Sequence, residues 1–521
     1  EARVVGIPKT DSTDHRPLII LSATYRVWAR RRAHDLGLWF DLWAPPGLFG
    51  GRKYVGASDA AALVAFRTER ARLGLSGPLH LASTDMEKYF DRLLLPTLRQ
   101  LTVMAKLDNS MLAVLDLYAH LRKHIFLDGS PSRYVLSGEG SCGVPQGCPL
   151  ACLFTNLAAA ALDEHLSRCS SVELYTYLDD RVYFACDQHS LEHALGAVAA
   201  FDSACGCTCN AGKSYYSCFG CTPRQLGPIL ASMPRARNSF RYLGIDILVQ
   251  GCGARVVAKQ RVASFLQRCS LVSLLPSAQR PFCTADAVAS LWLSAGSLYT
   301  LDELDKMVSA SASALRPRYQ RDSRVMLRSR LVEHLCGSLF HRTHPIAAAV
   351  YDVSLQIRRL FRFGLLSRSS WQQIWQARSR CRATPLLTLE RCSKRLDIAW
   401  GSLTTLVSHD DQYSFTESLG VVHLEDYSKH MLREVLRTSA WSFEARRRPK
   451  DFIGTARGVD MDSARALYRV PYGPALLTAG SWTAARLYIA GLVDSPLCVR
   501  CGSCWDTKEH RLWWCDDNAA A

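Results

Sequence analysis

Two adjacent aspartates, Asp179 and Asp180, stand between two short runs of strand-forming residues. The alternating residues that predict the flanking strands are Val172, Leu174 and Thr176 before the pair, then Val182 and Phe184 after it. The chain must therefore reverse at residues 178–180 in a tight hairpin. Asp is common at turns, but neighbouring carboxylates repel each other. The pair is consequently either a polar turn or part of a metal site.

A third carboxylate stands at another strand end. Residues 79–93 predict a strand that gives way to a helix opening near Asp85, with acids in its first turn. A single Asp at such a junction most often caps the helix. Three acids at strand ends instead suit two Mg²⁺ ions, because Mg²⁺ prefers carboxylate and phosphate oxygens and paired metals clamp an in-line displacement. Asp85, Asp179 and Asp180 are therefore candidate metal ligands.

A loop rich in Gly and Pro, residues 141–148, lies between these acids in the sequence. It runs into a helix predicted to start at Pro149, a favoured first helical residue. One face of that helix is apolar, through Leu150, Leu153, Phe154, Leu157 and Ala161. The loop is either a turn before a buried helix or a rigid support that holds Gln146 against a base or sugar.

The order of these segments resembles that of the motifs of reverse transcriptases. The residues within the motifs are most similar to those of LINE-type, non-LTR retrotransposons. The segments that carry the resemblance are Ile7-Pro8-Lys9 with His15-Arg16-Pro17-Leu18 and Tyr25-Arg26, Asp85 to Phe90, Pro145-Gln146-Gly147, Tyr177-Leu178-Asp179-Asp180, Gly206 to Lys213, and Phe240-Arg241-Tyr242-Leu243-Gly244-Ile245. A single motif would be weak support. Their common order over about 245 residues is strong support.

The resemblance implies roles for particular residues. Asp85, Asp179 and Asp180 would hold two Mg²⁺ ions, with Asp180 the weaker ligand. Lys213 would protonate the departing pyrophosphate. Tyr177, close to the adjacent pair Asp179 and Asp180 (the dyad), would bind substrate.

Three further residues are implied to bind the incoming nucleotide. Lys9 and Arg16 would grip its triphosphate, although two basic residues near a terminus are more often solvated surface. Phe90 would lie under the sugar and exclude a ribose 2′-hydroxyl, although a core aromatic is its ordinary role. The segment Tyr242-Leu243-Gly244 resembles the hairpin that grips the primer.

The chain also departs from the family pattern. Leu178 stands where these retrotransposons mostly carry Ala, which implies altered fidelity or rate. The segment of residues 45–52 lacks the Gln that usually precedes its Gly-Phe pair. A group of cysteines crowds residues 205–221, and unpaired thiols are favoured there over a metal site. Those cysteines are Cys205, Cys207, Cys209, Cys218 and Cys221.

Length and charge limit the broad class of protein. A chain of 521 residues predicts two to four domains. The excess of 63 Lys and Arg over 47 Asp and Glu, and a sequence pI near 9.1, favour a polyanionic partner, nucleic acid first and an acidic membrane surface second. The 20 cysteines are too irregularly spaced for a secreted disulfide scaffold and fit reduced intracellular thiols. No transmembrane helix or signal peptide is predicted. Because the chain begins at Glu1, we interpret it as a fragment of a longer protein.

The sequence predicts four regions along the chain. These are fingers and palm over 1–250, a helical thumb over 251–345, a basic helical region over 346–494 and a zinc-knuckle-like tail over 495–521. Residues 316–330 carry six arginines against one acid, and residues 358–382 carry seven arginines interleaved with four aromatics. Such stretches either track nucleic acid, with aromatics stacking on bases, or form a solvated face above a core.

The tail contains Cys498, Cys501, His510 and Cys515 in the spacing C-x2-C-x8-H-x4-C. These are four ligands at separations that tetrahedral zinc accepts, with Cys504 an alternative fourth ligand. The pattern also resembles the CCHC knuckle downstream of LINE-type polymerases. Free thiols are the ordinary alternative.

The sequence therefore predicts an α+β, right-handed fingers–palm–thumb polymerase, followed by a mostly helical region with a zinc knuckle. The resemblance implies a nuclear enzyme that copies an RNA template into DNA with dNTPs, priming from nicked target DNA. A catalytically inactive RNA-binding scaffold and an intron-encoded maturase remain alternatives. An RNA polymerase is disfavoured by Phe90. No endonuclease or ribonuclease H motif is recognised.

Overall fold

The computed structural model describes part of the 521 residues. The described residues are 1–8, 15–127, 130–136, 143–222, 225–236, 238–249, 256–276, 278–291, 299–315, 339–381, 385–396, 398–400, 406–408, 429–447, 493–506, 510 and 515. They divide into two compact units. Unit 1 is Glu1–Ala254 with Arg359–Thr384, and unit 2 is Arg255–Arg358 with Pro385–Ala521. The predicted basic stretch 316–330 lies outside the described residues.

Unit 1 contains two four-stranded sheets and most of the strands that the sequence predicts. Its elements are β1 (Ala2–Pro8), β2 (His15–Ile20), α1 (Ala23–Trp43), α2 (Ala57–Arg72), β3 (Leu79–Thr84), α3 (Tyr89–Arg92), α4 (Leu95–Met104), α5 (Asn109–Ala119), β4 (Lys123–Leu127), β5 (Ser130–Leu136), α6 (Ala151–Cys169), β6 (Glu173–Tyr177), β7 (Asp180–Ala185), α7 (Gln188–Ala204), η1 (Ala211–Lys213), β8 (Tyr215–Phe219), α8 (Pro228–Ser232), β9 (Ser239–Tyr242), β10 (Ile245–Leu248), α15 (Arg368–Gln376) and η5 (Arg378–Arg380).

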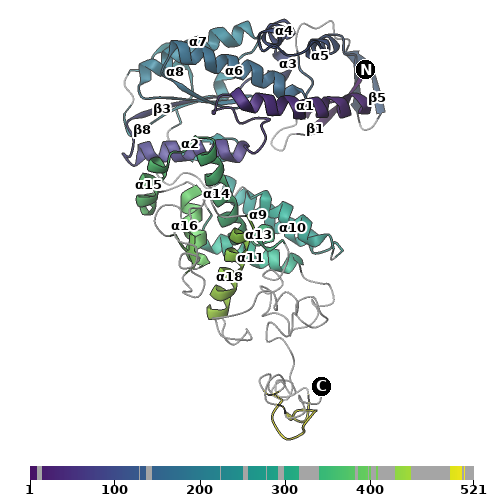
Figure 1. The fold of residues 1–521 in the computed structure, drawn as a ribbon, viewed down its shortest axis with the longest axis vertical. Coiled ribbons are helices and arrows are strands. Elements are labelled where there is room, and N and C mark those ends of the chain that lie inside the picture. Colours follow the sequence, from purple (N-terminus) through teal and green to yellow (C-terminus); the bar gives the residue numbers. More distant parts are fainter. Residues whose placement is uncertain are drawn as a thin grey trace. The chain divides into compact units, whose positions relative to one another are not determined.

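The central sheet of unit 1 has the strand order β6-β7-β3-β8. Every residue of β3 is buried, as expected for a strand covered on both faces. Helices α6 and α7 cover one face, and α2 lies on the other (Figure 1). The second sheet has the order β2-β1-β4-β5. Two further strands, β9 and β10, pair as a hairpin through Leu243 and Gly244, both with positive φ.

Residues after position 358 return to pack on α2. Arg359 donates two hydrogen bonds to Asp59 Oδ1, from Nε at 2.9 Å and from Nη2 at 2.8 Å. The fully buried Trp371 packs edge-to-face on Phe66, with ring centroids 6.0 Å apart. The aromatic residues of this basic stretch therefore fill a core, which is the second of the two interpretations that the sequence allowed.

Unit 2 is mostly helical in its described part. Its elements are α9 (Val256–Val272), α10 (Arg280–Ala289), α11 (Leu301–Leu315), α13 (Phe340–Thr343), α14 (Pro345–Arg362, whose last residues belong to unit 1), α16 (Pro385–Arg395), β11 (Ile398–Trp400), β12 (Leu406–Ser408) and α18 (Lys429–Arg447). The His344 ring accepts a hydrogen bond from the Ala347 amide at 3.2 Å, which caps α14 ahead of its first residue, Pro345.

No helix in the described part of the chain has both the length and the apolar character that crossing a bilayer requires. No disulfide joins any of the cysteines that the structure describes, which include the five in residues 205–221.

Candidate active site and metal centre

The two adjacent aspartates lie at the tip of the β6–β7 hairpin, as the sequence predicts. Tyr177 pairs with Asp180, which leaves Leu178 and Asp179 as a two-residue loop. Leu178 has φ of +59°, a left-handed conformation that costs a side-chain-bearing residue about 1–2 kcal/mol. The first loop position of this turn type normally takes glycine. The hairpin therefore holds its leucine under backbone strain.

A glycine on a neighbouring segment makes room for that leucine. A Cβ placed on Gly50 would lie 2.7 Å from both the backbone nitrogen and Cγ of Leu178. Residues 47–49 run alongside β6, because Thr176 donates to the Gly47 carbonyl at 2.9 Å and accepts from the Phe49 amide at 2.8 Å. This segment is the one that lacks the usual Gln, and it nevertheless supports the hairpin directly.

The strand register brings Asp85 to the same end of the sheet. Strands β3 and β7 are antiparallel, and the last pair of their ladder is Thr84 with Arg181. Asp85 directly follows Thr84, and Asp180 directly precedes Arg181, so both carboxylates lie at the same end of the sheet. The two distant segments that carry the three acids therefore converge through the backbone.

Asp85 does not open a helix, contrary to the prediction. The chain instead continues beside residues 208–210, through a bridge between Met86 and Cys209, and α3 begins only at Tyr89. The Asp85 amide donates to Ser214 Oγ at 3.2 Å, and its carbonyl accepts from the Asn210 amide at 2.8 Å. These bonds fix the backbone that carries the carboxylate.

Several predicted residues surround the acids. Lys213 ends the exposed turn η1, one residue before Ser214. Burial raises the pKa of Tyr177, and the nearby Cys152, Asp180 and Asp179 add to this rise. The wholly buried Tyr242, in the β9–β10 hairpin, has its pKa raised by burial and by Asp180. Both tyrosines therefore lie within electrostatic reach of the dyad.

Phe90 and the Gln146 loop are joined by backbone hydrogen bonds. The Val144 amide donates to the Phe90 carbonyl at 2.6 Å, and the Ile19 amide donates to the Gln146 carbonyl at 2.7 Å. Gln146 Nε2 also lies 3.4 Å from a carboxylate oxygen of Asp91. The loop therefore links α3 to β2, with the Phe90 side chain half-buried between core and surface.

Two expected positions differ from the structure or lie beyond its described part. The helix after this loop begins at Ala151 rather than Pro149, because residues 149–150 form a turn. Lys9 lies outside the described residues. The backbone of Arg16 pairs with Ile7 in the β1–β2 ladder. The roles assigned to Lys9 and Arg16 remain predictions.

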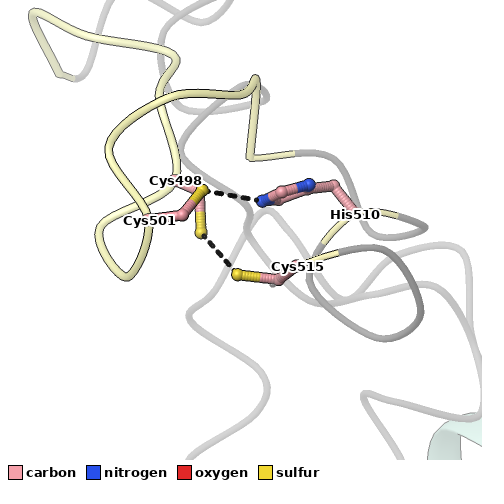
Figure 2. A group of neighbouring side chains, drawn as sticks. All are labelled: Cys498, Cys501, His510 and Cys515. Carbon is pink, nitrogen blue, oxygen red and sulfur yellow. Dashed lines mark hydrogen bonds between the residues drawn. The ribbon is translucent and has the colours of Figure 1, made fainter. Parts of the chain in front are cut away.

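The tail ligands converge more closely than the aspartates do. One ligand atom from each of Cys498, Cys501, His510 and Cys515 lies within 4.8 Å of the others (Figure 2). Cys501 Sγ lies 3.2 Å from His510 Nε2, and the thiols of Cys498 and Cys515 are 3.9 Å apart. Among the described residues this is the one such group, so the oxygens of the three aspartates are not gathered to that degree.

Hydrogen bonds shape the loop that carries the first two thiols. The Cys498 amide donates to the Cys504 carbonyl, and the Gly502 amide donates to the Cys498 carbonyl, both at 2.8 Å. Gly502 has a positive φ of 64°, which allows the chain to curl around the thiols. Hydrogen bonds from Ser503 lower the pKa of Cys501 to about 6. Three soft thiol donors and an imidazole suit zinc, and Cys504 is not among the converging ligands.

One pair of residues beneath the dyad was not predicted from the sequence. Arg181, directly after Asp180, is wholly buried and pairs with Asp202 on α7. An arginine directly before the run Val182 to Ala185, which is predicted to be a buried strand, is the sequence signal that could have indicated it.

Comparison with known proteins places most of unit 1 in a family. Residues 7–247 match the family described as reverse transcriptase (RNA-dependent DNA polymerase). The chain therefore contains a reverse transcriptase domain, with a polymerase fold of mixed helices and strands. No curated protein sequence matches the chain.

Solved structures with some likeness to the chain include telomerases from Candida species. The truncated apo telomerase from Candida tropicalis has 14% identity and a TM-score of 0.36, and the match covers 48% of this chain and 53% of that one. The Candida albicans telomerase with a fragment of telomeric RNA has 12% identity and a TM-score of 0.37, over 72% and 63% of the two chains. The chain thus spans about half to two thirds of the length of these two structures.

Proposed function

We propose that the chain is the RNA-directed DNA polymerase of a non-LTR retrotransposon. The observation that carries the proposal is the β3–β7 register inside a reverse transcriptase domain, because its last pair, Thr84 with Arg181, adjoins Asp85 and Asp180. The order of the motifs and the Cys and His tail downstream support the narrower assignment to LINE-type elements.

The residues present suit two Mg²⁺ ions, because Asp85, Asp179 and Asp180 offer hard carboxylate oxygens at one end of the sheet. When bound, such ions would activate the primer 3′-hydroxyl and neutralise the triphosphate. The chain's own residues position the reactants. Phe90 would select the deoxyribose and Gln146 would contact the base or sugar. Lys213 would protonate the leaving pyrophosphate.

In this proposal the template is the RNA of the element itself, and the primer is nicked chromosomal DNA. The protein would therefore act in the nucleus. The basic balance of the chain fits these polyanionic partners. The tail would hold one Zn²⁺ through Cys498, Cys501, His510 and Cys515 and would serve as a structural knuckle.

Primer extension tests the proposal. The purified chain is incubated with Mg²⁺ and a DNA primer annealed to RNA, and either dNTPs or rNTPs are supplied. We expect extension with dNTPs and little extension with rNTPs. Extension with rNTPs would refute the assignment of Phe90 as the sugar-selecting residue.

An RNA-binding scaffold is the second candidate function. The observation that favours it is that the three aspartate side chains are less closely gathered than the tail ligands. This alternative predicts that the chain retains primed RNA in a gel-shift measurement and adds no nucleotide to the primer.

A further inference from the structure

A buried ion pair lies directly behind the candidate active site. Arg181 Nη1 and Asp202 Oδ1 are 2.7 Å apart, and the exposed fraction of the two residues is 1% and 4%. Removing both charges from water is costly, and the Nε of Arg181 has no hydrogen-bond partner. Because apolar residues often replace such pairs without loss of stability, stability alone is a poor reason for this one.

The arginine shares its strand with the dyad. Arg181 follows Asp180 in β7, so its side chain lies on the opposite face of the sheet. Its backbone pairs with Thr84 on one side and Thr176 on the other. These two threonines immediately precede Asp85 and Tyr177. Any shift of Arg181 would therefore move the strand ends that carry the candidate metal ligands.

The same guanidinium contacts the element that carries Phe90. Arg181 Nη2 lies 3.4 Å from the Tyr89 hydroxyl, and the guanidinium carbon is 5.4 Å from the Tyr89 ring centroid. Tyr89 is wholly buried and is the chain neighbour of Phe90 in the short helix α3. Helix α3 has only four residues, too few to be rigid by itself, so the contacts of Tyr89 hold it in place.

The aspartate anchors the loop on the other side of Asp85. The Asp202 carbonyl, near the end of α7, accepts from the amides of Cys205 and Cys207 at 3.0 and 2.8 Å. The following residues reach the site, because the Thr208 carbonyl accepts from the Glu87 amide at 2.9 Å. The ion pair thus joins β7, α3 and α7, and the main chain of Asp202, rather than its carboxylate, holds the loop that supports Asp85.

We infer that Arg181 and Asp202 are a positioning pair, which sets the geometry of the metal-binding carboxylates and of the Phe90 ring together. The inference rests on the proposed function and deepens it. A core pair with no positioning role would affect stability alone. A positioning pair also affects the Mg²⁺ requirement and the choice between dNTP and rNTP.

The test uses the full chain with Arg181→Met and Asp202→Leu combined, which replaces the pair by apolar side chains of similar volume. We expect a folded protein whose dNTP incorporation rate falls about 10–100-fold, the range found for outer-shell partners of metal ligands. The Mg²⁺ concentration for half-maximal rate should rise several-fold, and discrimination against rNTPs should weaken. Arg181→Lys keeps the charge but loses the planar fork of the guanidinium. Its incorporation rate should therefore lie between those of the unchanged chain and the double variant.

A second ion pair in unit 1, between the buried Asp59 and the half-buried Arg359, supplies the control. Arg359→Met with Asp59→Leu removes the ion pair on α2, and should lower stability without changing the Mg²⁺ requirement or sugar discrimination. If the Arg181 and Asp202 variant changes only its melting temperature, as the control does, the inference is wrong. If the unchanged chain adds no dNTP, the proposed function fails, and the inference falls with it.

Discussion

The two candidate metal sites are built in opposite ways. At the sheet end, the backbone register of β3, β6 and β7 brings together acids that lie far apart in sequence. In the tail, four ligands within 18 residues converge side chain to side chain. A site built on a packed sheet can exist before any ion binds. A site in a short loop gains much of its order from the metal itself.

The largest expected effect concerns the sheet-built site. Asp179→Asn should lower primer extension by at least about 10³-fold, equivalent to about 4 kcal/mol of transition-state stabilisation, because a metal ligand is lost. The melting temperature should hardly change, since the sheet does not depend on the ion. Steady-state extension assays and calorimetry measure the two quantities.

Asp187→Asn is the matched control for that variant. Asp187 caps α7 just beyond the other end of β7, where it accepts from the Ser190 amide at 2.8 Å. Its replacement should cost at most about 1 kcal/mol of stability and leave extension unchanged. If the Asp179 variant and the unchanged chain were equally active, Asp179 would not be a ligand of a catalytic metal, and the sheet-built site would be refuted.

The next effect concerns the tail. We expect the purified chain to hold a single equivalent of zinc, and Cys515→Ser to hold much less, because one of four ligands is lost. Cys504→Ser should retain the metal, since this cysteine lies outside the converging group. Metal analysis after gel filtration measures the content. Equal zinc loss in both variants would contradict the ligand set.

The third prediction concerns the close packing of residues 47–49 against β6, the strand that leads to the dyad. Gly47→Ala should destabilise unit 1 by about 3 kcal/mol, because the new Cβ would overlap the Leu174 carbonyl of β6. Gly37→Ala is the control. Position 37 lies in α1 with open space around it, so alanine should stabilise the helix by about 0.5–1 kcal/mol. Denaturant titration distinguishes the two, and a stabilised Gly47 variant would contradict the packing described.

The last effect is confined to acidic pH and extends the comparison to the helices of unit 2. Burial lowers the pKa of both His341 and His344 to about 4, from an ordinary value of 6.5. The unfolded chain therefore binds protons that the folded chain does not. Stability should fall by about 1.4 kcal/mol per pH unit for each histidine as pH drops from 6.5 towards 4.

His344→Asn keeps an acceptor at the start of α14 and removes one of these titrations. The free energy of opening of α14, measured by hydrogen exchange of its amides, should therefore depend less on pH in this variant. An unchanged pH dependence would show that His344 is not buried in its neutral form.

How much the sequence could predict depended on how local the determining contacts are. The β6–β7 hairpin and the tail ligands follow from alternation and spacing within a few residues, and the structure brings each together where the sequence placed it. The helix expected near Asp85 begins at Tyr89 instead, because residues 86–87 bond to residues 208–209, more than a hundred positions away. No local pattern reports such a contact.

The same reasoning explains what the sequence missed. Arg181 looked like an ordinary strand residue, and only its tertiary partners, Asp202 and Tyr89, reveal its position between three elements. The aromatics near Trp371 allowed both stacking on bases and packing in a core. Only the contact with Phe66 on α2 decides in favour of packing.

The return of residues 359–384 to α2 has a consequence for how the protein is made. Because a ribosome releases the chain from its N-terminus onwards, α2 emerges long before Arg359 and Trp371 exist to cover it. Unit 1 therefore cannot complete its core until well over a hundred further residues have been synthesised. A nascent chain interrupted after residue 254 would present bare apolar surface, and would be a natural client for chaperones.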